Sequence, residues 1–145
     1  MSKNTLLAPS NLPNHAPNFS AIKEEDFLPA VKEAIKEARA NIDAVKADAA
    51  APNFDNTIIA METSSETLDT ITSIFYNQLY ANGTDGLQAL AMDIGPLCAE
   101  LSSDVAMDPV LFERVKTVYD AKDSLDLNAE QDTLLTNSYK VFFFF

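Results

Sequence analysis

The sequence is short of several residue types that many folds and sites require. It has one cysteine, one histidine, three glycines and no tryptophan among 145 residues. A lone cysteine, Cys98, excludes an intrachain disulfide, and a lone histidine, His15, leaves no second histidine for a zinc motif on a helix. The scarcity of glycine, in a body rich in alanine, leucine, glutamate and lysine, favours helix.

Cationic side chains are also scarce. Ten lysines and arginines stand against 22 aspartates and glutamates, for a formal charge of −12. So acidic a surface repels phosphate backbones and anionic lipid, and we expect neither a nucleic-acid nor a membrane partner. The first residues lack a long apolar signal segment, and no stretch approaches membrane-spanning length. A cytoplasmic location is the default expectation, while a secreted or periplasmic form made without its signal stays open.

The chain is organised around the segment from Pro52 to Glu62. Pro52 cannot continue a helix that arrives through Ala49 to Ala51, so a first helix ends near it. Short oxygen-bearing side chains follow, and each of them could cap a new helix: Asn53, Asp55, Asn56 and Thr57. Phe54 is placed to staple the new helix to its entry segment.

Apolar residues at three- and four-residue steps predict an all-α fold of about five helices in a bundle-like array. The first helix is expected over about 24–49, the second from the organising segment to about 80, and the third over about 87–105. Gly83 ends the second helix, and Pro96 is expected to kink the third. Asp108 and Pro109 open a fourth helix that runs to about 121. Asn128 with Gln131 resembles a capping box and opens a fifth.

The first 22 residues form a different kind of segment. Pro9, Pro13 and Pro17 disfavour helix, so we expect an extended arm over residues 1–22. Its apolar side chains are too many for a free linker, so the arm should pack on a helical domain over residues 23–145: Leu6, Leu7, Leu12, Phe19 and Ile22.

Few residues could carry chemistry, and each is better explained without it. His15 has no partner ligand in sequence and is expected on a surface loop. Glu62 and Glu66 lie four apart, but no helix supplies the histidine of a di-iron site. Cys98 is expected to be a buried, inert thiol. The run from Asp123 through Ser124 to Asp126 matches the short acyl-carrier motif, yet a helix should restart only at Asn128. We therefore predict no catalytic, cofactor-binding or metal-binding residue in this chain.

Several stretches, in order, resemble the N-terminal region of one family: the thimet oligopeptidase, oligopeptidase A and dipeptidyl carboxypeptidase family of zinc metallopeptidases. The resemblance extends from the arm to about Phe142, and the run around Ala16 and Pro17 leans toward the bacterial dipeptidyl carboxypeptidase branch. The stretches that carry it are Leu12-Pro13, Ala16-Pro17-Asn18-Phe19 and Ile22, Phe27 with Pro29-Ala30, Pro52-Asn53-Phe54-Asp55-Asn56-Thr57-Ile58 with Ala60-Met61-Glu62, Ile74-Phe75, Leu87-Gln88-Ala89-Leu90, Leu111-Phe112-Glu113-Arg114-Val115, and Leu135, Tyr139 and Phe142.

The resemblance implies a parent protein that cleaves short peptides with zinc held by a His-Glu-x-x-His helix and a further glutamate. This sequence has no counterpart of that helix, so no catalytic residue carries over, and zinc is expected only in the absent catalytic domain. The N-terminal helices would form part of the wall of a peptide channel. The final run from Phe142 to Phe145 departs from the family, and we expect a truncated chain that contacts the missing domain or self-associates. The alternatives are a free-standing acidic helical interaction domain and an acyl-carrier-like protein acting through Ser124.

Overall fold

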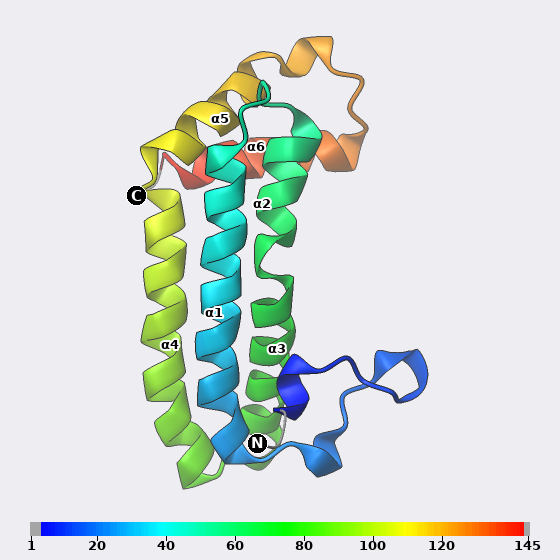
Figure 1. Ribbon diagram of the computed structural model, residues 1–145, viewed down its shortest axis with the longest axis vertical. Helices are drawn as coiled ribbons and strands as arrows, with labels where there is room; N and C mark the ends of the chain where they lie inside the picture. Colours follow the sequence, from blue (N-terminus) through cyan, green and yellow to red (C-terminus); the bar gives the residue numbers. More distant parts are fainter. Residues whose placement is uncertain (1–3, 144–145) are drawn as a thin grey trace. The chain divides into compact units, whose positions relative to one another are not determined.

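The computed structural model describes residues 4–143, and over that range every regular element is a helix (Figure 1). The predicted all-α fold is therefore confirmed. The long helices are α1 (Glu24–Ala47), α3 (Glu66–Asn82), α4 (Asp85–Ala106), α5 (Pro109–Asp120) and α6 (Ala129–Val141). Within 4–143, none of these helices is both long enough and apolar enough to span a bilayer.

The capping residues expected from the sequence begin and end several of these helices. Asp108 caps α5 by accepting from the backbone N–H groups of Val110 and Leu111, with Pro109 in the first helical position. Asn128 caps α6 through a capping box with Gln131. Gly83 ends α3 in the left-handed conformation, with φ of 50°. These predictions are confirmed. Each rests on a local requirement of the backbone: an acceptor for the first N–H groups of a helix, or a residue that tolerates positive φ at its end.

The second predicted helix is not continuous, and that prediction is wrong. A π-helix, η4 (Phe54–Ile59), leads into one turn of α-helix, α2 (Ala60–Glu62), and a 3-10 turn, η5 (Thr63–Ser65), precedes α3. Asn53 is the cap, in a reciprocal box with Asn56. In the interrupted segment, the Thr63 hydroxyl donates to the Ile59 carbonyl at 2.9 Å. Such hydroxyl-to-carbonyl bonds compete with the regular helical ladder and bend it.

Two boundaries also differ slightly from expectation. α1 ends at Ala47, and α4 begins at Asp85, two residues before the predicted start. The Thr84 hydroxyl, which accepts from the Leu87 N–H at 3.2 Å, favours the earlier start. α4 continues through Pro96.

The contacts divide the chain into two compact units. Unit one contains residues up to 38 and residues 65–99, so it holds the arm, the first part of α1, α3 and most of α4. Within it the three helical parts lie side by side (Figure 1). The fully buried rings of Phe27 and Phe75 meet edge to face, with centroids 5.1 Å apart. The predicted division of the chain at residue 22 stays a prediction.

The arm in unit one is extended between three short 3-10 turns: Thr5–Leu7, Pro13–His15 and Phe19–Ala21. The Asn4 amide donates to the Asp26 carbonyl of α1 at 2.8 Å, which ties the start of the arm to a helix. Asn14 and His15 both have positive φ, 57° and 55°.

Unit two contains residues 39–64 and residues from 100 onward. Its main core joins η4, α5 and α6 through five buried side chains: Phe54, Ile58, Val115, Val118 and Leu135. A second cluster consists of Ile42, Val45 and Leu111. The capped start of η4 thus delivers Phe54 and Ile58 directly into the centre of this unit.

Candidate functional site

The most unusual polar side chain in unit two is the guanidinium of Arg114, on the second turn of α5. Arg114 is only 8% exposed. Its Nη1 donates to the backbone carbonyl of Asp48 at 2.9 Å, and its Nη2 lies 3.7 Å from Asp48 Oδ2. Among residues 4–143, neither Nε nor Nη2 has a hydrogen-bond acceptor, and both are closed to solvent. Leaving a buried donor unpaired costs about 1–3 kcal/mol, and more for a charged group.

Arg114 lines an open pocket of about 440 Å³, which we call the Arg114 pocket. Apolar side chains make up much of its wall, and Val110 is 46% exposed. The lining residues are Pro52, Pro109, Val110, Glu113, Arg114 and Thr117. A cationic donor group beside apolar walls suits a ligand that combines an acidic group with a hydrocarbon part.

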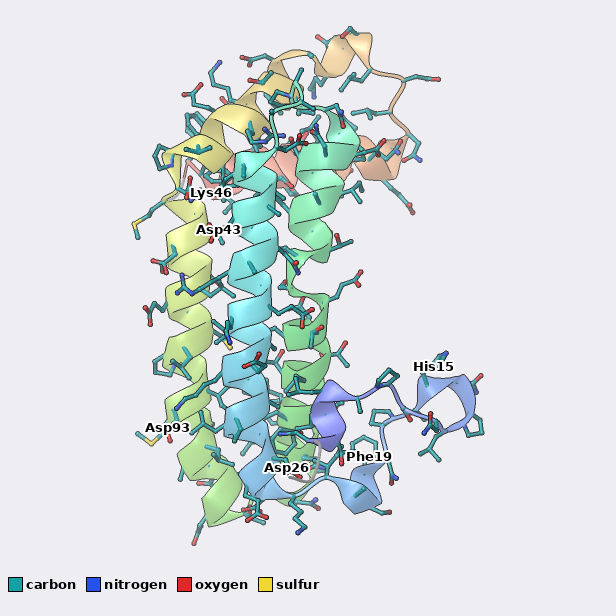
Figure 2. All side chains as sticks on the ribbon, in the orientation of Figure 1. His15, Phe19, Asp26, Asp43, Lys46 and Asp93 are labelled. Atoms are coloured by element: carbon teal, nitrogen blue, oxygen red, sulfur yellow. The ribbon has the colours of Figure 1, made fainter. Side chains whose placement is uncertain are left out.

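A second charged group in unit two gathers around the start of α5. The Lys46 ammonium lies 2.6 Å from Asp108 Oδ2 and 3.8 Å from Asp43 Oδ1, and Figure 2 shows Lys46 beside Asp43. Partial burial raises the pKa of the Asp108 carboxyl, but bonds from Lys46 and from two backbone N–H groups outweigh that effect and hold the pKa below its ordinary value. The same bond to Asp108 raises the pKa of Lys46.

Arg39 also pairs with two carboxylates in unit two. Its Nη2 lies 2.7 Å from Asp104 Oδ2 and 3.8 Å from Glu100 Oε1. The three side chains are 42%, 48% and 67% exposed, respectively. Exposed pairs of this kind are screened by water and salt, and they stabilise little.

Unit one has its own pocket, between the arm and α3. It has a volume of about 550 Å³ and is lined by arm residues, among them His15, together with Thr70 and Ile74. Figure 2 shows His15 on the outer turn of the arm, and its side chain is exposed. The sequence prediction of a surface-loop histidine is confirmed.

The remaining candidate residues from the sequence do not come together in one site. Glu62 and Glu66 are both exposed and lie on either side of the η5 turn. Ser124 ends a 3-10 turn and donates to the Ala121 carbonyl at 2.7 Å, so it does not begin a helix. Cys98 is half-buried, where a buried thiol was expected. Partial burial, and to a smaller degree the charge of Asp69, raise the pKa of its thiol.

The described side chains do not fit a zinc ion. Within residues 4–143, no three histidine, cysteine, aspartate or glutamate side chains come together as a metal site would require. A catalytic zinc needs three protein ligands. We therefore assign no zinc ligand and derive no metal-dependent step from these residues.

Comparison with known proteins shows which proteins this chain is similar to in sequence. The chain is 38% identical over 130 residues to a dipeptidyl carboxypeptidase of Salmonella typhimurium. It is 36% identical over 132 residues to the dipeptidyl carboxypeptidase of Escherichia coli K12. The matches cover 90% and 91% of this chain but 19% of each relative, so the chain spans about a fifth of their length. No family model matches it. The predicted resemblance is confirmed: nearly all of this chain is similar in sequence to part of two dipeptidyl carboxypeptidases.

Proposed function

We propose that this chain is the N-terminal helical part of a peptidase of the dipeptidyl carboxypeptidase type. The observation that carries the proposal is the 38% identity along 90% of the chain to a protein of that name. A match of such length includes most of the helices of both units, so the similarity is not confined to a short motif. The activity, removal of dipeptides from short peptides, would belong to the larger protein.

The same proposal makes the chain non-catalytic by itself. The zinc ion and its ligands would lie in the part of the relatives that the match does not cover, which is about four-fifths of their length. The partners would be that catalytic part and, through it, short peptides. The family resemblance supports a place for these helices in the wall of a peptide channel.

The first experiment is a peptidase assay on the purified chain. The chain is incubated with an N-blocked tripeptide, with and without zinc, and release of the C-terminal dipeptide is followed by mass spectrometry. We expect no release above a buffer control. Zinc-dependent release would contradict the non-catalytic assignment. The intact mass of the same sample tests the carrier alternative, because a phosphopantetheine group on Ser124 would increase it.

The second experiment reads the source DNA beyond the codon for Phe145 in all three frames. A downstream frame encoding a His-Glu-x-x-His helix would support the proposal. A stop codon followed by no such frame would refute it, and a free-standing interaction domain would then be the better assignment.

A further inference from the structure

We propose that Tyr119 and Tyr139 form a site of oxidative cross-linking, at which a one-electron oxidant joins their two rings through a carbon–carbon bond. Tyr119 lies on α5 and Tyr139 on α6, with ring centroids 4.0 Å apart and ring planes only 7° from parallel. The other ring pairs among residues 4–143 have centroids at least 5.0 Å apart. At 4.0 Å the facing carbon atoms of two parallel rings are in van der Waals contact. The inference rests on this contact and does not depend on the proposed peptidase function.

Neighbouring side chains of unit two hold both rings in place. Tyr119 and Tyr139 are half-buried and pack against the core that joins η4, α5 and α6. Phe112 stacks on Tyr139 with centroids 6.2 Å apart, and Phe143 meets Tyr139 edge to face at 5.0 Å. The Lys122 ammonium lies 5.2 Å from the ring centroid of Tyr119. The two phenols are therefore in contact before any reaction, so their coupling is a step within one molecule and not an encounter between two.

The reaction balances with two equivalents of a one-electron oxidant. Each phenol loses one electron to the oxidant and its hydroxyl proton to water, which leaves a tyrosyl radical on each ring. The unpaired electron is shared between the oxygen and the ring carbons ortho and para to it, and the para carbon already carries the side chain, so the two radicals pair at ortho carbons. Each of these carbons then loses its proton and each oxygen regains one. The product has two hydrogen atoms fewer than the starting protein, and its new bond closes the loop between α5 and α6, which restricts the unfolded chain.

The chain contains its own comparison for this geometry. Its four tyrosines form two pairs, and the second pair is Tyr76 and Tyr80 on α3. The rings of that pair have centroids 6.3 Å apart and planes 29° from parallel, so they are not in the same close contact. Tyr80 is 83% exposed and is therefore far more open to an oxidant in solution than the half-buried Tyr119 and Tyr139. If exposure decided the outcome, coupling would involve Tyr80; if ring contact decides it, coupling joins Tyr119 to Tyr139.

The test treats the dilute, purified chain with hexachloroiridate(IV), a small ion that takes one electron and becomes hexachloroiridate(III). Salt is added to screen the protein's formal charge of −12, which would otherwise repel this anion. The monomer is then isolated under reducing and denaturing conditions, because reductant opens any disulfide between the Cys98 side chains of two molecules and leaves a carbon–carbon bond intact. It is analysed by the blue fluorescence of dityrosine, by its intact mass, and by mass spectrometry of its proteolytic peptides.

We expect dityrosine fluorescence in the monomer, an intact mass lower by two hydrogen atoms, and a joined peptide that contains both Tyr119 and Tyr139. Tyr119→Phe and Tyr139→Phe each keep the ring but remove one phenol, so each should lower the yield of fluorescent monomer at least tenfold. The matched control Tyr80→Phe removes the exposed phenol of the other pair and should leave that yield unchanged.

Four results would overturn the proposal: no dityrosine under conditions in which the same oxidant couples free tyrosine, dityrosine only in dimers and larger species, a joined peptide that contains Tyr76 and Tyr80 in place of the expected pair, or an unchanged yield in Tyr119→Phe. Circular dichroism checks that the phenylalanine variants fold. If one of them does not, the identity of the joined peptide from the unmodified protein decides the question by itself.

Discussion

Substitutions of Asp108 should separate the two interactions that its carboxylate makes, the cap on α5 and the ion pair with Lys46. Oδ1 accepts from the backbone N–H groups of Val110 and Leu111, at 2.9 and 3.1 Å, and so caps α5. Oδ2 holds the Lys46 ammonium at 2.6 Å. Asp108→Ala removes both, and loss of the cap alone lowers the free energy of unfolding by about 1 kcal/mol. Asp108→Asn keeps a side-chain oxygen for the cap, so it should cost clearly less.

The pH dependence of the effect follows from the direction of the Asp108 pKa shift. The pKa of Asp108 is lower in the folded chain than its ordinary value. A group with a depressed folded pKa stabilises the fold above its unfolded pKa, and that contribution is lost as the pH falls through the folded value. The stability difference between the unmodified protein and Asp108→Asn should therefore be full at about pH 6 and shrink below about pH 4.

The assay is urea unfolding followed by far-ultraviolet circular dichroism, with the melting temperature as a second measure. For a chain of this size, a loss of 1 kcal/mol lowers the melting temperature by about 4 °C. Asp93→Asn is the matched control, because it removes the same charge from an exposed position of α4 and should change stability by less than about 0.5 kcal/mol. The reasoning fails if Asp108→Ala is as stable as the unmodified protein, or if Asp108→Asn is the less stable of the two variants.

Four further substitutions test the two cores and two helix glycines, each by urea unfolding. Phe75→Ala removes a fully buried ring that packs on Phe27 and should cost about 3–5 kcal/mol; a cost below 1 would show that the ring is not in the core. Leu135→Ala should cost about 3 kcal/mol, because its side chain is fully buried in the unit-two core. Gly83→Ala should destabilise by about 1 kcal/mol, because Gly83 has φ of 50°. Gly95→Ala should instead stabilise by up to about 1 kcal/mol, because Gly95 lies inside α4 and an added methyl group would meet no neighbouring part of the protein within 4 Å. The argument is contradicted if both glycine substitutions change the free energy of unfolding in the same direction.

The predictions from sequence were right where a local pattern decides the structure. Asp108 followed by Pro109, and Asn128 followed by Gln131, satisfy the first N–H groups of a helix within four residues. Apolar residues at helical spacing place Phe27 and Leu135 in cores whatever lies opposite them. Such features need no knowledge of distant parts of the chain.

They failed where the outcome depends on competing or distant contacts. The polar run from Glu62 to Thr67 interrupts the apolar stripe between Met61 and Leu68, and its hydroxyl groups bond backbone carbonyls, so the helix breaks there. This signal is local and is present in the sequence. The burial of Arg114 could not be predicted, because its acceptor is the carbonyl of Asp48, 66 residues earlier in the chain.

The side-chain amide of Asn56 makes two hydrogen bonds to the backbone at the start of η4. Its Oδ1 accepts from the Asn53 N–H at 2.8 Å, and its Nδ2 donates to the Ala51 carbonyl at 3.1 Å. Asparagine amides hydrolyse slowly to carboxylates as proteins age. At Asn56 that conversion would preserve Oδ1 as an acceptor and replace the donor nitrogen with an oxygen of a negatively charged carboxylate, which would face the Ala51 carbonyl and repel it. The entry into the unit-two core is therefore sensitive to chemical ageing at one nitrogen atom, and the storage life of the folded chain should depend on it.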